Sequence, residues 1–116
     1  MTDSYVYIVE CSDGTLYTGW TNRPLQRIRA HSEGRGAKYT KGRGPVKLVY
    51  LEALEDKSVG LIREAKIKKM IAAKKRQLIL ESAERTVELE QQLLETERRQ
   101  QEHSENKRKQ RKTKSE

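Results

Sequence analysis

The sequence predicts an α+β fold with the element order β-β-α-β-α-α, followed by a C-terminal helical extension. Residues 4–10 and 15–20 are short β-forming runs that flank Ser-Asp-Gly, which predicts a hairpin. Residues 46–53 alternate as a third strand, with Val46, Leu48 and Tyr50 on one face. Helices are predicted over 24–33, 57–70 and 72–80. We therefore place one small domain at residues 1–80 and an appendage at 81–116.

The turn of the hairpin decides which side chains share a face. A two-residue turn would pair Cys11 with Leu16 and send Tyr7 and Tyr17 to opposite faces. A three-residue turn pairs Cys11 with Thr15 and places both tyrosines on one face. A one-residue slip reverses every side chain, so only one register is compatible with a shared tyrosine site. We predict the three-residue turn.

A basic helix follows the hairpin. Asn22 is predicted to cap it, and Pro24 suits its first turn because the missing N–H has no helical partner there. The helix is expected to run to about residue 33 and to stop at Gly34. Arg27 and His31 are one turn apart, so they share a helix face.

Positive charge is concentrated in residues 16–50. This stretch holds eight Lys or Arg and one acid, and the whole chain has a net charge of +8. Such a field favours a polyanionic partner such as nucleic acid. The alternative is that these residues form only a solvated basic surface. Tyr39 and Thr40 are weaker candidates for contact with nucleic acid. The candidate nucleic-acid-binding residues are Arg23, Arg35, Lys38, Lys41 and Arg43.

The helix over 57–70 is apolar around most of its circumference, yet it contains one acid on an apolar arc. Glu64 lies between Leu61 and Ile67, where a carboxylate is partly desolvated and needs a partner. One interpretation is a functional carboxylate. The other is an ion pair with Arg63 or Lys68.

Several classes of protein are excluded by composition. The single cysteine, Cys11, forms no internal disulfide, and two histidines, His31 and His103, are too few for a histidine metal cage. No apolar run reaches the roughly 20 residues of a membrane span. The N-terminus does not resemble a signal peptide, so we expect a cytoplasmic protein.

The C-terminal appendage differs in composition from the rest. Residues 81–105 hold eight acids and three bases, which predicts a solvated helix. A separate hypothesis for the chain is an interaction adaptor in which this helix docks on a larger protein partner. Leu80, Val87 and Leu94 repeat every seven residues, but the intervening positions are poor for a coiled coil. Residues 107–116 carry six Lys or Arg and one Glu, and we expect them to be disordered.

The spaced motifs of the first 80 residues resemble the GIY-YIG endonuclease superfamily. The first element is Tyr5-Val6-Tyr7 and the second is Tyr17-Thr18-Gly19, and Arg27, His31 and Glu64 match the family's functional positions. The stretches 36–40 and 45–50 resemble its small stand-alone bacterial members in particular. Three positions depart from the family pattern: Tyr5 replaces a glycine, Thr18 an isoleucine, and Trp20 a lysine found in some relatives.

The resemblance implies a three-stranded antiparallel sheet flanked by helices, and divalent-metal-dependent hydrolysis of DNA with Mg²⁺ or Mn²⁺. It implies that Tyr7 or Tyr17 activates or orients the attacking water, and that Arg27 stabilises charge on the phosphate. His31 would assist proton transfer or hold the phosphate, and Glu64 would anchor the metal. Elementary chemistry asks for similar parts, because phosphodiester hydrolysis builds negative charge that a guanidinium and a metal ion stabilise.

A second hypothesis comes from a different class of function. The same basic helix and loop could belong to a catalytically weak or silent nucleic-acid-binding module, in which aromatic side chains stack on bases. Glu64 discriminates between the two hypotheses, since only a nuclease has metal-dependent activity to lose. In both cases DNA is favoured over RNA by the resemblance.

Overall fold

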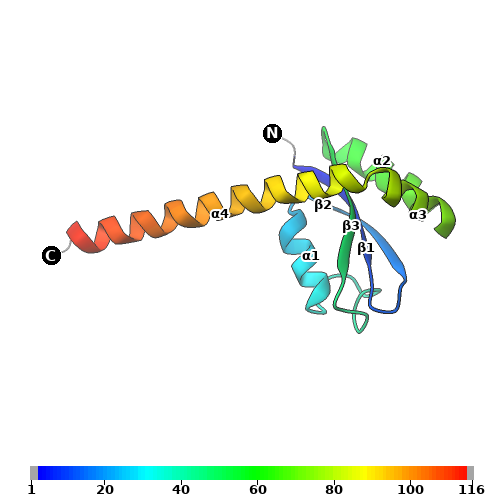
Figure 1. Ribbon diagram of the computed structural model, residues 1–116, viewed down its shortest axis with the longest axis horizontal. Coiled ribbons are helices and arrows are strands. Elements are labelled where there is room, and N and C mark those ends of the chain that lie inside the picture. Colours follow the sequence, from blue (N-terminus) through cyan, green and yellow to red (C-terminus); the bar gives the residue numbers. More distant parts are fainter. Residues whose placement is uncertain (1–2, 115–116) are drawn as a thin grey trace.

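The fold is a three-stranded antiparallel sheet with helices on both faces (Figure 1). The computed structural model describes residues 3–114, with side chains described as far as residue 105. The strands are β1 (Ser4–Glu10), β2 (Leu16–Thr21) and β3 (Lys47–Leu54), and β1 lies between the other two. The predicted α+β class and the order of the first six elements are confirmed.

The hairpin has the three-residue turn predicted from the sequence. The Cys11 amide donates to the Thr15 carbonyl oxygen over 2.8 Å, and Gly14 takes the left-handed conformation with φ of +83°. Tyr7 pairs with Gly19 in the register of β1 and β2. Glycine suits the turn because it adopts positive φ without steric cost.

Four helices complete the fold: α1 (Pro24–Ser32), α2 (Lys57–Lys68), α3 (Ala72–Glu81) and α4 (Ala83–Lys114). The predicted Asn22 cap is wrong, because Arg23 occupies the cap position of α1 without a side-chain hydrogen bond. The Arg23 amide instead donates to the Thr21 hydroxyl at the end of β2. By contrast, Asp56 caps α2 by accepting from the Val59 amide over 2.9 Å.

The central strand β1 is buried on both faces, which explains its nearly unbroken run of β-branched and aromatic residues. One cluster, on the face with α1 and α4, comprises Tyr5, Tyr7, Val9 and Leu51. The other cluster, on the face with α2 and α3, comprises Val6, Ile8, Tyr50 and Ile67. The sheet therefore separates two cores, and successive β1 residues alternate between them.

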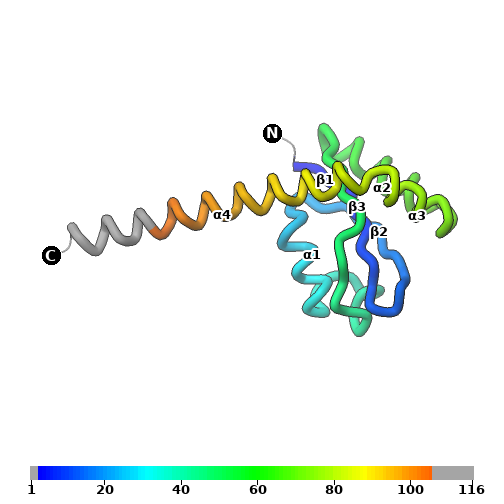
Figure 2. The backbone as a smooth tube through the Cα atoms, viewed as in Figure 1, coloured from blue at the N-terminus to red at the C-terminus, as the bar shows by residue number. Residues whose placement is uncertain are grey.

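The first half of α4 packs on the domain (Figure 2). Leu89 and Leu93 contact the first core cluster, and the buried Thr86 hydroxyl accepts from the Leu51 amide over 3.2 Å. Further along, Glu97 forms a two-bond ion pair with Arg29 of α1. A boundary after residue 80 would therefore separate residues that pack together.

For the later part of α4, the disorder that its composition predicts stays a prediction. The helix is assigned as far as Lys114, and residues 115–116 lie outside the described part of the chain. Residues 107–114 are mostly Lys, Arg and Gln, which have high helix propensity, so a continuing helix is compatible with the sequence. Across the residues that the structure describes, no helix is both long and apolar enough to cross a membrane.

Candidate active site

A buried hydrogen bond between a strand tyrosine and a helix histidine forms the centre of the site. The Tyr7 hydroxyl oxygen and Nε2 of His31 are 2.6 Å apart, and the two residues are 1% and 0% exposed. Tyr7 comes from the middle of β1, and His31 from the last turn of α1. Helix α1 packs against the sheet and so brings its last turn over the tyrosine face.

The hairpin register provides the space that Tyr7 needs. Gly19 lies opposite Tyr7 on β2, and a Cβ at this position would overlap the Tyr7 hydroxyl. Any other residue would displace the phenol, because real Cβ atoms do not approach so closely. The glycine of Tyr17-Thr18-Gly19 is therefore a packing requirement of the site.

Tyr17 lies beside this pair on the same face of the sheet. Its ring centroid is 6.5 Å from that of Tyr7 and 5.2 Å from that of His31. Its ring stacks on that of Tyr39 at 5.7 Å, and the Arg43 guanidinium lies 4.4 Å from the Tyr39 ring centroid. The structure thus brings the two predicted tyrosines and the predicted histidine into one aromatic cluster.

Arg27 and Glu64 both act electrostatically on the same tyrosine. Burial raises the Tyr7 pKa to about 12, while a hydrogen bond from Arg27 and its positive charge act to lower it, and the charges of Tyr17 and Glu64 act to raise it. Burial lowers the His31 pKa to about 4, with Arg27 acting in the same direction. Both Tyr7 and His31 are therefore neutral near pH 7.

Glu64 occupies the environment that its position on the apolar arc predicts. Its side chain is 18% exposed and lies 3.5 Å from the Lys68 ammonium on the next turn of α2. Arg63, the other suggested partner, instead pairs with Glu52 at 3.0 Å. The Glu64 carboxylate therefore has one loose ion pair and remains available as an oxygen ligand.

The ligand chemistry around Glu64 fits one class of metal. Within residues whose side chains are described, no group of three His, Cys, Asp or Glu converges, so the protein offers no complete metal cage there. A single carboxylate is compatible with Mg²⁺ or Mn²⁺, because Mg²⁺ usually keeps several waters and takes substrate phosphate oxygens as further ligands.

Trp20 lies outside the cluster, although it occupies the position where some relatives of the resembled family have lysine. It packs with the second core cluster, on the face opposite Tyr7 and Tyr17. Its indole N–H donates to the Ser4 hydroxyl over 2.8 Å, and Lys57 lies over its ring. The substitution therefore leaves the aromatic cluster intact.

The basic residues predicted to contact nucleic acid fall into two groups. Arg43 pairs with Asp13 at 2.6 Å, and Arg35 pairs with Glu33, so both guanidinium groups have an acidic partner at the protein surface. The remaining three are exposed on the surface around α1 and the following loop: Arg23, Lys38 and Lys41. Arg43 serves to fasten the loop to the hairpin, where its carbonyl oxygen also accepts from Ser12.

Two residues contact His31 in the structure although little or no role is predicted for them from the sequence. Thr40, a weak candidate by sequence, is fully buried with its hydroxyl 2.8 Å from Nδ1 of His31. Gly36 lies so close to the imidazole that a Cβ there would overlap Nδ1. Both residues lie in the short stretch Gly36-Ala37-Lys38-Tyr39-Thr40, whose composition does not indicate that it folds back onto α1.

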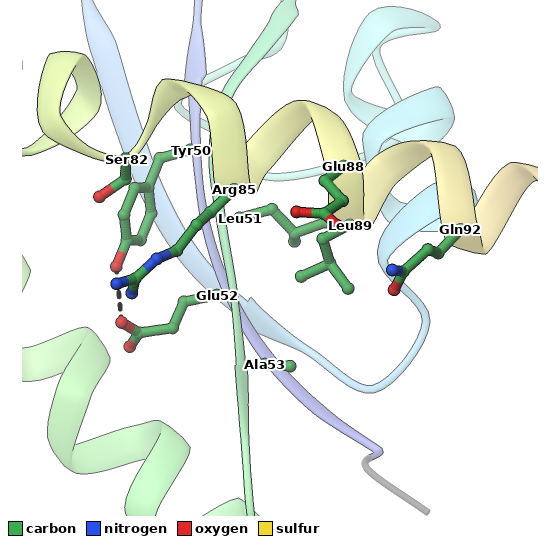
Figure 3. Close-up of a pocket in the computed structure, with 9 residues that line it drawn as sticks. All are labelled: Tyr50, Leu51, Glu52, Ala53, Ser82, Arg85, Glu88, Leu89 and Gln92. Atoms are coloured by element: carbon green, nitrogen blue, oxygen red, sulfur yellow. Dashed lines mark hydrogen bonds between the residues drawn. The ribbon is translucent and has the colours of Figure 1, made fainter.

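A separate cleft of about 340 Å³ lies between β3 and α4 (Figure 3). The Tyr50 hydroxyl donates to Glu52 over 2.8 Å at one end of it, and Arg85 extends from α4 toward this pair. None of the predicted site residues lines this cleft. The aromatic cluster, on the opposite side of β1 from Tyr50, is the candidate site.

Comparison with known proteins agrees with this architecture. Residues 3–77 match the GIY-YIG catalytic domain. The UPF0213 protein of Syntrophus aciditrophicus (strain SB) is 57% identical over 86 residues, which cover 73% of this chain and 99% of that protein. The UPF0213 protein CPE1444 of Clostridium perfringens is 58% identical over 76 residues, covering 66% and 82% of the two chains.

A solved structure is also similar. The solution NMR structure of the UPF0213 protein BH0048 from Bacillus halodurans has 44% sequence identity and a TM-score of 0.48, and the match covers 69% of this chain and 85% of that one. The family match spans both tyrosine triplets and the positions of Arg27, His31 and Glu64. The chain is a small protein that belongs to the GIY-YIG catalytic domain family.

Proposed function

We propose that this protein is a divalent-metal-dependent endonuclease that hydrolyses phosphodiester bonds in DNA. The observation that carries the proposal is the buried Tyr7–His31 hydrogen bond with Tyr17, Arg27 and Glu64 around it. Titratable groups with strongly shifted pKa values that gather in one place are typical of catalytic sites. Membership of the GIY-YIG family supports the same class of reaction.

Arg27 is the residue that binds the scissile phosphate. Its guanidinium hydrogen-bonds Tyr7 and its charge acts on both Tyr7 and His31, so Arg27 belongs to the same cluster. A planar guanidinium matches two phosphate oxygens, and a fixed positive charge stabilises the negative charge that builds up in the transition state.

The two tyrosines are the groups that handle the attacking water. A hydroxyl of Tyr7 or Tyr17 orients the water or takes its proton, and a phenol does the latter only where cations stabilise its ionised form. Arg27 supplies such a cation beside Tyr7. His31 is fully buried behind Tyr7, so it acts through the Tyr7 hydroxyl and does not reach the phosphate itself.

Glu64 is the residue that would hold Mg²⁺ or Mn²⁺. A bound divalent ion would neutralise charge on the phosphate oxygens and make a nearby water more acidic. The charge of the partly buried Glu64 carboxylate on α2 acts to raise the Tyr7 pKa, which supports assigning the ion-binding residue and the phenol to one site.

The exposed basic residues beside the site hold the DNA backbone. Arg23, Lys38 and Lys41 are exposed, and residues 16–50 carry a large excess of positive charge. Contacts of this kind bind phosphates without reading sequence, and their strength falls steeply as salt concentration rises.

The proposal is tested by a cleavage assay at low salt with single-stranded, duplex and branched DNA and with RNA. Each substrate is incubated with Mg²⁺, with Mn²⁺ and with a chelator. Arg27→Ala and Glu64→Gln are expected to lower cleavage by about 100-fold or more, the usual effect of removing a group that stabilises the transition state. Each has a matched control: Arg29→Ala on the same helix, and Glu52→Gln in its ion pair with Arg63.

The outcomes separate the nuclease from the binding module. Metal-dependent cleavage that is lost in the two site variants and kept in the two controls supports the nuclease. Salt-sensitive DNA binding without cleavage, unchanged by Glu64→Gln, would overturn it in favour of a nucleic-acid-binding module.

A further inference from the structure

His31 makes a second set of polar contacts on the side that faces away from Tyr7. Nε2 contacts the Tyr7 hydroxyl, whereas Nδ1 faces the loop that follows α1. There the Thr40 hydroxyl is 2.8 Å from Nδ1, and the Ala37 amide nitrogen is 3.3 Å from it. Every polar atom of the imidazole therefore has a partner within the protein.

These partners are not equivalent as hydrogen-bond donors and acceptors. A backbone N–H can only donate, so the Ala37 amide requires a lone pair on Nδ1. The Thr40 hydroxyl has a single proton, which it can give either to Nδ1 at 2.8 Å or to the Ala37 carbonyl oxygen at 3.0 Å, and only the first leaves Nδ1 as an acceptor. The Ala37 carbonyl oxygen already accepts from the Thr40 and Lys41 amides, so the hydroxyl proton is available for Nδ1. A proton on Nδ1 would point at the Ala37 N–H, so the arrangement favours an unprotonated Nδ1. Because the buried imidazole is neutral, its one proton then resides on Nε2.

We propose that Thr40 is a positioning residue that, together with the Ala37 amide, fixes the His31 proton on Nε2, so that His31 donates a hydrogen bond to the Tyr7 hydroxyl oxygen. The Tyr7 proton is then directed away from His31. A donated hydrogen bond favours the ionised form of a phenol, so His31 opposes the effect of burial on Tyr7. The catalytic consequence rests on the proposed nuclease function, whereas the position of the proton is a property of the free protein.

The loop is built to hold Thr40 at this point. The Thr40 and Lys41 amides donate to the Ala37 carbonyl oxygen over 3.1 and 3.2 Å, which closes a tight turn. Gly36 lets the chain pass directly over the imidazole, since a Cβ there would overlap Nδ1. Thr40 is 0% exposed, so its hydroxyl is out of reach of a substrate and acts only through His31.

The first test is the ¹⁵N NMR spectrum of the histidine side chains at pH 7, which distinguishes protonation at Nε2 from protonation at Nδ1. His31→Gln assigns the signals, and the exposed His103 serves as an internal reference. The wild type is expected to show His31 protonated at Nε2 alone. A wild-type signal with the proton on Nδ1 would overturn the proposal.

Substitutions at Thr40 test its own contribution. Thr40→Val keeps the β-branched shape but removes the hydroxyl, and it is expected to give a detectable Nδ1-protonated population. Thr40→Ser keeps the hydroxyl and is expected to match the wild type. Thr40→Cys replaces the hydroxyl with a thiol, which is a weaker donor. It tests the contribution of the hydroxyl if Thr40→Val does not fold. Identical His31 tautomers in Thr40→Ser and in the folded variants without the hydroxyl would refute the role of Thr40.

Kinetics separate this inference from the proposed function. Thr40→Val is expected to lower kcat by about 10- to 100-fold with little change in KM, the size of effect seen when a partner that orients a functional histidine is removed. Thr40→Ser is expected to restore it. A wild type that cuts no substrate but shows the expected tautomers would refute the nuclease and leave the inference intact. An active enzyme in which substitution of Thr40 leaves the His31 tautomer unchanged would refute the role of Thr40 but not the nuclease.

Discussion

The Tyr7 hydroxyl oxygen and Nε2 of His31 lie 2.6 Å apart in the interior, although 24 positions separate the two residues in the chain. The contact joins the central strand to the last turn of α1. Because both groups are buried, neither the Tyr7 hydroxyl nor Nε2 of His31 could hydrogen-bond to bulk water if the other were removed. The same hydrogen bond therefore contributes to the fold and orders the candidate active site, and these two contributions can be measured separately.

Replacing Tyr7 with Phe is expected to abolish the proposed activity and to destabilise the protein modestly. The buried Nε2 of His31 loses its partner, which costs about 1–3 kcal/mol. Tyr50→Phe is the matched control, because Tyr50 is an equally buried tyrosine of the other core whose hydroxyl bonds Glu52. Urea unfolding should show a loss in both variants, whereas cleavage should be lost only in Tyr7→Phe. Equal activity in the two variants would show that the Tyr7 hydroxyl has no part in the chemistry.

Gly19→Ala is expected to damage the site more than the fold. The new methyl group would overlap the Tyr7 hydroxyl and force the phenol away from His31. Gly14→Ala is the control: Gly14 has φ of +83° and no atom near its Cβ position, so alanine there adds backbone strain of about 1 kcal/mol without touching the site. Thermal unfolding should show a loss of stability in both variants, whereas cleavage should be lost only in Gly19→Ala. A Gly19→Ala protein with wild-type cleavage would contradict the packing requirement.

The hairpin and its site face were predictable because local rules determine them. A β-forming run, an Asp-Gly turn and another β-forming run leave two registers, and only one places Tyr7 and Tyr17 on the same face. His31 is predicted to share a helix face with Arg27, because the two residues are four positions apart. Glu64 was predictable as a partly desolvated acid for the same reason, since its neighbours on α2 define an apolar arc.

Other parts were not predictable because they depend on where an irregular loop goes. Thr40 contacts His31 through a non-periodic turn, and nothing in its immediate sequence indicates burial. Similarly, Arg43 reads as a free cation in the sequence but pairs with Asp13 across the hairpin. The packing of α4 is masked by its many charges, although Leu89 and Leu93 are one helical turn apart and point into the core.

Acidification is expected to destabilise the protein through His31. Its pKa falls from the ordinary 6.5 to about 4 in the folded protein, so the unfolded chain binds the proton more readily. The contribution of neutral His31 is therefore complete above pH 6.5 and is lost as pH falls toward 4, by about 3 kcal/mol in all. Urea unfolding between pH 7 and pH 4 measures this loss.

His31→Gln provides the comparison for the pH series, because glutamine keeps a neutral N–H donor that does not titrate. The variant is expected to be less stable than the wild type at pH 7 but to lose less stability on acidification. Other acidic groups affect both proteins alike, so the difference between the two curves isolates His31. Parallel curves would mean that His31 accepts a proton in the folded state without penalty.

The first half of α4 is expected to stabilise the domain despite its polar composition. Leu93 packs against the core cluster on β1, while its neighbour Leu94 is 42% exposed on the other side of the helix. Leu93→Ala is expected to cost about 1–3 kcal/mol of unfolding free energy, and Leu94→Ala well under half of that, because only the first removes buried apolar surface.

Truncation tests the same relationship at the level of the whole helix. A chain ending at Glu105 retains Thr86, Leu89, Leu93 and the Arg29–Glu97 pair, so its urea midpoint should match that of the full chain. A chain ending at Ser82 exposes the surface that these residues cover and leaves the Leu51 amide without its Thr86 partner, so its midpoint should fall. Equal midpoints in the two truncated chains, together with equal costs for the two leucine substitutions, would show that α4 is only an appendage. A lower midpoint for the shorter chain would instead mean that the helix belongs to the structural unit that holds Tyr7, since Leu89 and Leu93 pack against the same core cluster.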